Sequence, residues 1–198
     1  MNKVAEALAW QIGVWDQMAP VYIREIDKRF APVVEQLLGR AQFRPGQHVL
    51  DLGTGTGSVA VRAAPAIAPN GHVTAVDISP EMLALARQRI AGAARTDIRF
   101  AEGRAEALSI DSESIDVVLA CLSLMYVIDR AAAAREIARV LRSGGQLVPA
   151  VWGDPNALTS CCCSRQLPPS RRSPPRPAWD RARSPTRLPS SPSCRRRV

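Results

Sequence analysis

Residues 49–57, with the sequence VLDLGTGTG, decide how this chain folds. The short apolar run that begins them is typical of a buried strand, and three glycines follow at alternate positions. Glycine adopts positive φ angles without strain and lets a backbone approach a ligand closely. The alanine-rich residues 58–67 then predict a helix that Pro65 should end early. Strand, loop and helix together indicate a nucleotide-like site, although glycine-rich turns also serve ordinary tight packing.

An acidic residue after the next predicted strand strengthens this interpretation. Residues 72–77 form a second strand that ends in Asp77, 20 residues beyond Gly57. A carboxylate there is placed to accept hydrogen bonds from ribose hydroxyls, as in dinucleotide-binding folds. Asp77 could instead cap the following helix, but Ser79 already provides that cap, with Pro80 as the first helical residue. The loop and the acid therefore predict an adenosine-type cofactor.

The rest of the chain continues the alternation of strands and helices on both sides of this unit. Apolar residues recur at helical spacing near the N-terminus, and short apolar runs recur downstream. The alternation predicts an α/β fold, a Rossmann-like three-layer α/β/α sandwich with a mainly parallel sheet. The further expected elements are helices at residues 4–30 (interrupted at Pro20), at 32–40 and at 131–142 (stopped by Gly144-Gly145), and strands at 97–101, 115–122 and 146–152.

Two other phosphate-binding chemistries fit the sequence poorly. The Tyr-x-x-x-Lys pair of short-chain dehydrogenases is absent, because Ile26 follows Tyr22 and Arg130 follows Tyr126 at that spacing. A P-loop needs Gly-Lys-Ser/Thr after its glycines, and no such triplet follows residue 57. A nicotinamide cofactor and a nucleoside triphosphate are both disfavoured.

Charge and cysteines divide the chain near residue 158. The net charge is +8, yet residues 160–198 hold ten arginines and one acid, so the remainder is close to neutral. Nucleic-acid binding is therefore disfavoured, and any such binding would come from the tail alone. No apolar run is long enough to span a membrane, and the N-terminus lacks a secretory signal, so we expect a cytoplasmic protein. Four of the five cysteines lie in the tail, three of them adjacent, and we predict no metal site.

Four segments resemble the class I S-adenosylmethionine-dependent methyltransferases, in the small-molecule branch that includes the ubiquinone/menaquinone C-methyltransferases. The resemblance covers about residues 13–157. Its segments are VLDLGTGTG at 49–57, VTAVDISPEML at 73–83, AREIARVLRSGG at 134–145 and the N-terminal WDQMAPVY at 15–22.

The resemblance implies S-adenosylmethionine as cofactor and a role for each matching residue. Asp51 and the loop Gly53, Thr54, Gly55 and Gly57 would hold the methionine end, Asp77 the ribose and Ile78 the adenine. Arg104 stands where the family usually has an Asp that meets the adenine amino group, and arginine accepts no hydrogen bond. Either the backbone near Ala105 replaces that contact, or cofactor affinity is lower. Cys121 would lie beside the sulfonium, although a small core residue is the better interpretation.

The methyl transfer implied by the resemblance needs few catalytic groups from the protein. Positioning an acceptor in line with the methyl group supplies most of the catalysis, and a base is needed only where the accepting atom starts protonated. Tyr22, Asp16 and Tyr126 are candidate catalytic residues at the mouth of the site, and Tyr22 equally suits the apolar helix face.

The predicted function is methyl transfer to a small-molecule acceptor. The alternatives are a cofactor-binding remnant without turnover and nucleic-acid binding through the tail. Acceptor and oligomeric state are not indicated.

The predicted domains are a helical lid at 1–45, a cofactor-binding core at 46–157 and a basic tail at 158–198. The tail is rich in Arg, Pro and Ser, and we expect it to be disordered. Members of the resembled family continue with two further strands that are not recognisable here. We therefore expect an incomplete sheet in which the fifth strand is an open edge. A frameshift near residue 158 in an arginine-rich, GC-rich gene would explain the change.

Overall fold

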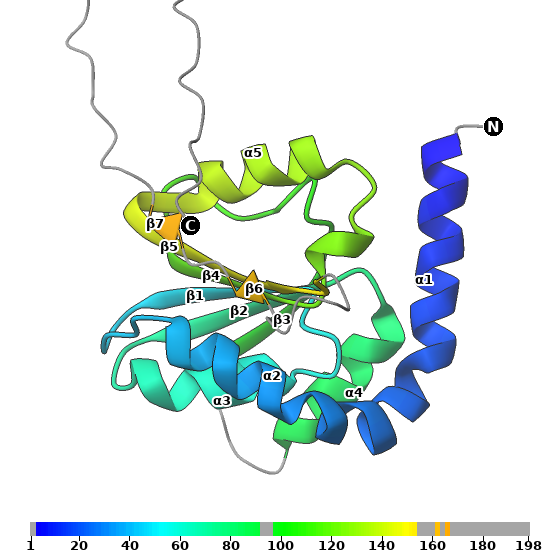
Figure 1. Cartoon of the computed structure of the whole chain (residues 1–198), viewed down its shortest axis with the longest axis horizontal. Helices are drawn as coiled ribbons and strands as arrows, with labels where there is room; N and C mark the ends of the chain where they lie inside the picture. The colour runs from blue at the N-terminus through cyan, green and yellow to red at the C-terminus, as the bar shows by residue number, and fades with distance from the viewer. Residues whose placement is uncertain (1–2, 92–96, 154–160, 163–164, 167–198) are drawn as a thin grey trace, which may run out of the picture.

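A computed structural model describes residues 3–91, 97–153, 161–162 and 165–166, and these form one sheet with helices on both faces (Figure 1). The helices are α1 Lys3–Val21, α2 Asp27–Arg40, α3 Ser58–Ala63, α4 Pro80–Ala91 and α5 Arg130–Val140. The strands are β1 His48–Leu52, β2 His72–Asp77, β3 Ile98–Glu102, β4 Ile115–Cys121, β5 Leu141–Val151, β6 Cys161–Cys162 and β7 Arg165–Gln166.

The sheet has the strand order β3-β2-β1-β4-β5-β6, with β7 also paired to β5. Strands β1 to β5 are parallel, whereas β6 and β7 run antiparallel to β5. The chain moves outward from β1 through β2 to β3 and then returns to the other side of β1. This reversal between β1 and β4 creates a crevice at the carboxyl ends of the strands, where ligands bind in open α/β sheets.

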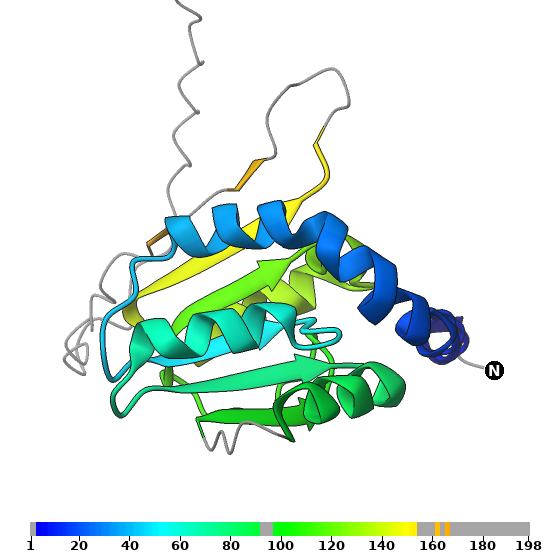
Figure 2. The ribbon, with the colours of Figure 1, turned by 90° about the horizontal axis from the view of Figure 1, so that it is seen from below.

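Two separate apolar cores fill the space between the sheet and its helices. Helices α2, α3 and α4 lie over one face, as Figure 2 shows, and α5 covers the other. Strand residues alternate between the cores: Val49 packs in the first, with Leu37 of α2, and Leu50 packs in the second, with Ile137 of α5. The predicted three-layer α/β/α sandwich is confirmed.

The N-terminal helices differ from the prediction in how they join. Pro20 does not interrupt α1, which continues to Val21 and passes through a π-helical turn, Tyr22–Ile26, directly into α2. The missing amide of a proline removes one ladder hydrogen bond, and a locally wider turn accommodates that loss. Pro32 does not begin a helix either, because it lies inside α2. Helix α2 packs on the sheet, so only α1 extends away from the core.

The joint between α5 and β5 lies earlier than expected. The glycines at 144 and 145 were predicted to stop the helix, but α5 ends at Val140 and β5 begins at Leu141. Gly144, at φ +79°, lies instead in the irregular first part of β5, before the regular pairing of Gln146 with Val117. The pairing of Leu141 with Ile115 draws the chain into the sheet and overrides the local glycine signal.

The outer edge of β5 is not fully open. Residues 161–162 and 165–166, which composition assigns to an unstructured tail, pair with residues 150–151 and 146–147 of β5. Backbone pairing needs no apolar side chain, so an exposed strand edge can recruit a polar segment. The rest of the predicted disordered tail, at 158–160, 163–164 and 167–198, lies outside the described residues. In the part of the chain that is described, no helix has the length and apolar character to cross a membrane.

Candidate functional site

A cavity of about 110 Å³ lies at the carboxyl ends of β1, β2 and β4, where the strand order reverses. The glycine loop, Asp77 and Ile78 form one part of its wall, next to Ser123 of the segment after β4, and residues of α1 with Tyr22 and Tyr126 form another. The residues that line it are Leu8, Gln11, Trp15, Tyr22, Leu52, Gly53, Gly55, Asp77, Ile78, Met82, Ala105, Glu106, Cys121, Leu122, Ser123, Leu124, Tyr126 and Val127.

The glycine loop is held in shape by hydrogen bonds to the end of β2. The amides of Gly53 and Thr54 both donate to the carbonyl of Val76, at 2.8 and 3.0 Å. Gly53 has φ +74°, and a Cβ atom there would overlap the Cβ of Ser123. Gly55, at φ +55°, has open space where its side chain would be. Glycine is therefore required at 53 by packing and backbone angle together, whereas Gly55 leaves its face of the loop free for a ligand.

Asp77 is oriented by the backbone on both of its oxygens. Its Oδ2 accepts from the Gly55 amide at 2.7 Å and its Oδ1 accepts from the Ser79 amide at 3.0 Å. Burial raises the pKa of this carboxyl above its ordinary value. Each oxygen keeps a second lone pair, so Asp77 can still accept from hydroxyl groups in the cavity.

Asp51 lies beneath the loop and is fully buried. Its Oδ2 accepts from the Thr54 hydroxyl at 2.6 Å, while its Oδ1 has no partner among the described residues. Burial raises the pKa of Asp51 to about 7. A buried oxygen without a partner is costly, and a positively charged donor would satisfy it.

The aromatic wall is a small cluster centred on Trp15. Its ring meets that of Tyr126 edge-on with centroids 5.0 Å apart, and that of Tyr22 at 6.5 Å. Gln11 Nε2 donates to the Tyr126 carbonyl at 2.6 Å, which fixes α1 against the segment after β4. Burial, followed by the charge of Asp27, raises the pKa of Tyr22 far above its ordinary value, so its phenol stays protonated.

Comparison with known proteins agrees with this geometry. Residues 49–145 match a family described as a methyltransferase domain. Residues 49–145 thus carry a methyltransferase domain, and the chain has the class I methyltransferase fold. Similar curated proteins include the uncharacterised protein Rv1403c of Mycobacterium tuberculosis, 34% identical over 143 residues that cover 72% of this chain and 48% of that protein. The ubiquinone/menaquinone biosynthesis C-methyltransferase UbiE of Hahella chejuensis is 30% identical over 154 residues, covering 77% and 59%. The chain thus spans about half the length of the curated relatives it matches.

A solved structure supports the cofactor. The chain is similar to phosphoethanolamine N-methyltransferase 2 of Haemonchus contortus in complex with S-adenosyl-L-methionine, with a TM-score of 0.58 and 27% identity. That match covers 62% of this chain and 28% of the other. The resemblance predicted from the motifs is confirmed, and S-adenosylmethionine is the cofactor of the family.

The fold brings eight of the thirteen predicted site residues to the cavity wall. They are Tyr22, Gly53, Gly55, Asp77, Ile78, Ala105, Cys121 and Tyr126. Five do not line it. Asp51 and Thr54 support the loop from below, and Gly57 packs against Ala86 and Phe100. Asp16 accepts a hydrogen bond from Ser79. Arg104 forms a backbone bridge with Ala107 outside the cavity.

Sequence reasoning did not single out three polar residues of the wall. Glu106 faces the cavity in place of Arg104, whose Nη2 lies 3.5 Å from the Glu106 Oε1. Ser123 donates to the Leu52 carbonyl at 2.6 Å and packs against Gly53, and Gln11 comes from α1. Glu106 could have been identified from the sequence, because it follows Arg104 and Ala105 in the segment that was compared with the family. Ser123 and Gln11 carried no local signal because only the fold brings them to the cavity.

Proposed function

We propose that this chain transfers a methyl group from S-adenosylmethionine to a small, uncharged acceptor. The observation that carries the proposal is the single cavity that combines the glycine loop and Asp77 on one wall with Trp15, Tyr22 and Tyr126 on the other. The first wall would hold the cofactor, and the second would receive the acceptor.

The residues present fit the cofactor. Asp51, buried beneath the loop and not exposed to the cavity, carries an oxygen without a described partner, and its negative charge would attract the ammonium of the cofactor's methionine end from below the loop. Asp77 would accept from the ribose hydroxyls, with its orientation already set by two backbone amides. Ile78 and Ala105 would pack on the adenine, and Glu106 is the charged side chain nearest in sequence to Arg104 that faces the cavity.

When bound, the cofactor supplies an electrophilic methyl group on its sulfonium. The chain's own residues would orient the acceptor and exclude water. Orienting two reactants well lowers the activation barrier by about 7–11 kcal/mol. Tyr22 would act as a hydrogen-bond donor and not as a base, because its raised pKa keeps it protonated. An uncharged acceptor whose nucleophilic atom carries no proton needs no base, whereas the O–H proton of a phenol or quinol would have to pass to a carboxylate that lines the cavity, such as Glu106.

The charges of the wall favour an uncharged acceptor. Among the residues that line the cavity, Asp77 and Glu106 are the acids, and Lys, Arg and His are absent. An anionic acceptor would meet these two carboxylates without a compensating cation. A neutral molecule with an apolar or aromatic surface would instead pack against Trp15 and Tyr126.

A second candidate function is cofactor binding without turnover. The chain spans about half the length of its relatives, and the part that they possess in addition could be needed to complete an acceptor site. Two experiments separate the candidates. Calorimetric titration with S-adenosylhomocysteine should show micromolar binding that Asp77→Ala abolishes. Incubation with labelled S-adenosylmethionine and a panel of phenols and quinols should then transfer label. Binding without transfer to any acceptor favours the second candidate, and an absence of binding refutes both.

A further inference from the structure

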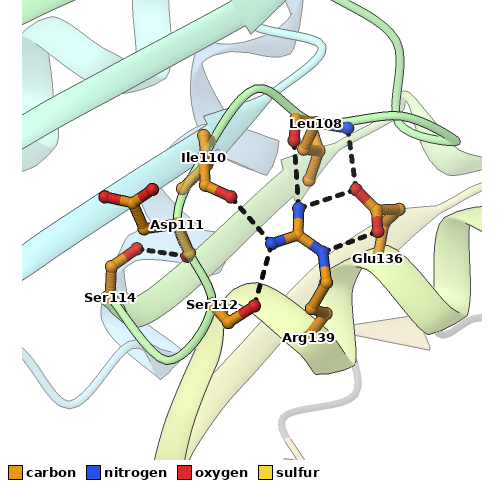
Figure 3. A network of polar contacts seen from close by, with 7 residues as sticks. All are labelled: Leu108, Ile110, Asp111, Ser112, Ser114, Glu136 and Arg139. Atoms are coloured by element: carbon orange, nitrogen blue, oxygen red, sulfur yellow. Dashed lines mark hydrogen bonds and ion pairs between the residues drawn. The ribbon is translucent and has the colours of Figure 1, made fainter.

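An arginine and a glutamate on α5 hold the β3–β4 loop, residues 103–114 (Figure 3). Glu136 accepts two hydrogen bonds from Arg139, at 2.7 Å on its Oε1 and 2.8 Å on its Oε2. This two-pronged pairing is the strongest geometry available to an arginine and a carboxylate. We call the pair the Arg139–Glu136 clasp.

The clasp grips both polar backbone groups of Leu108. The Leu108 amide donates to Glu136 Oε2 at 2.8 Å, and the Leu108 carbonyl accepts from Arg139 Nη2 at 3.0 Å. Arg139 Nη1 also donates to the Ile110 carbonyl at 2.8 Å and to the Ser112 hydroxyl at 3.2 Å. All five N–H groups of the guanidinium are therefore in use, and lysine, with three donors on a single nitrogen, cannot reproduce the pattern.

The gripped residue lies directly beyond the part of the loop that lines the cavity. Ala105 and Glu106 line the cavity wall, and the Ala107 amide donates to the Arg104 carbonyl at 3.2 Å, which closes a tight turn just before Leu108. At its other end this turn follows Gly103, whose amide donates to the Asp77 carbonyl at 2.9 Å. The cavity segment is thus a short span fixed between Asp77 and the clasp.

We propose that Arg139 and Glu136 are positioning residues, which set the Ala105–Glu106 segment against the adenosine part of the cofactor. The inference rests on the proposed function. Neither side chain lines the cavity, so both act through the loop. The loop has no helix of its own to hold it, and in this chain Arg104 does not face the ligand. The placement of Ala105 and Glu106 then depends on the anchor at Leu108.

The test compares Arg139→Lys and Glu136→Gln with the wild-type chain, well below the unfolding midpoint of each variant. The probes are S-adenosylhomocysteine and adenosine, titrated by calorimetry. Arg139→Lys should weaken both by roughly tenfold, the factor expected for one charge-assisted hydrogen bond. Glu136→Gln keeps an acceptor for the Leu108 amide and should weaken both by a smaller factor. Amide hydrogen exchange at residues 105–108 should accelerate in the same order.

Arg142→Lys is the matched control. Arg142 pairs with Asp116 at 2.7 Å and donates to the Glu113 carbonyl at 3.3 Å, at the far end of the same loop. It should lower the unfolding midpoint but leave both affinities within about twofold of wild type.

Unchanged affinities in well-folded Arg139→Lys and Glu136→Gln would overturn the inference and leave the proposed function standing. An equal loss in Arg142→Lys would show a general effect of stability and would also overturn it. Failure of the wild-type chain to bind either probe would refute the proposed function, and the inference with it.

Discussion

Asp51 is the residue whose burial most directly links stability to binding. Its raised pKa of about 7 means that half of the folded molecules carry a neutral Asp51 near neutral pH. The ammonium of S-adenosylhomocysteine should prefer the ionised form. We expect the affinity to rise as pH increases, by up to about tenfold per unit below the pKa, and to level off above about pH 8. Calorimetry from pH 5.5 to 8.5 measures this, and Asp51→Asn should flatten the profile. A wild-type profile already flat would contradict the assignment.

The same carboxyl should also reduce stability at high pH. The folded chain holds its proton more tightly than the unfolded chain, whose pKa is the ordinary 3.8. The stability penalty is therefore absent below about pH 4, grows as pH rises, and is complete above about pH 7, at roughly 4 kcal/mol. The unpaired amide hydrogens of an asparagine would offset about 1–3 kcal/mol. We expect Asp51→Asn to be more stable than wild type at pH 8 but not at pH 4 in urea unfolding. Equal differences at both pH values would exclude the mechanism.

Gly53 should tolerate no side chain. Alanine there would be strained by the φ of +74° and would overlap Ser123, which holds the start of the segment after β4. We expect Gly53→Ala to cost more than about 1 kcal/mol of stability and to remove S-adenosylhomocysteine binding. Gly13→Ala is the control, because Gly13 lies in α1 with open space around it. That substitution should stabilise the chain by about 0.5–1 kcal/mol without affecting binding. A Gly53→Ala protein with normal affinity would mean that the loop adjusts.

At the scale of elements, a hydrogen bond joins α1 to the start of α4. The Ser79 hydroxyl donates to Asp16 Oδ1 at 2.6 Å and accepts from the Met82 amide at 3.1 Å, so it is both link and helix cap. Ser79→Ala removes both roles and should lose about 1–2 kcal/mol of stability. Asp16→Ala removes the link and a longer, 3.4 Å bond from the Glu81 amide but leaves the Ser79 cap, and it should destabilise less. If α1 closes the cavity, both variants should weaken S-adenosylhomocysteine binding by a similar factor. Thermal unfolding and calorimetry on both variants test this. A change in stability alone would mean that α1 does not contribute to binding.

At the scale of the whole molecule, the described residues leave an apolar groove of about 340 Å³ beside α5. It is lined by Leu124, Val127, Arg130, Ala133, Ala134, Ile137, Ala138, Leu141 and Leu147. Contiguous exposed apolar surface promotes association. We expect self-association that increases with concentration and that Ala138→Glu, an exposed groove position, reduces. Ala131→Glu, exposed on α5 outside the groove, should not. Sedimentation velocity at two concentrations tests this, and a monomer throughout would mean that the groove is covered.

The sequence by itself determined the alternation of strands and helices, the glycine loop, Asp77 and the family. Those features depend on local chemistry: apolar runs, residues that permit positive φ, and a cap such as Ser79. Tertiary structure alone decided what crosses between elements. It placed Ser123 under Gly53, turned Glu106 and not Arg104 to the cavity, and brought Gln11 to Tyr126. It also overrode local signals, carrying a continuous helix past Pro20 and pairing residues of the predicted tail with β5. Packing and strand pairing act between residues far apart in the chain, so local pattern did not reveal them.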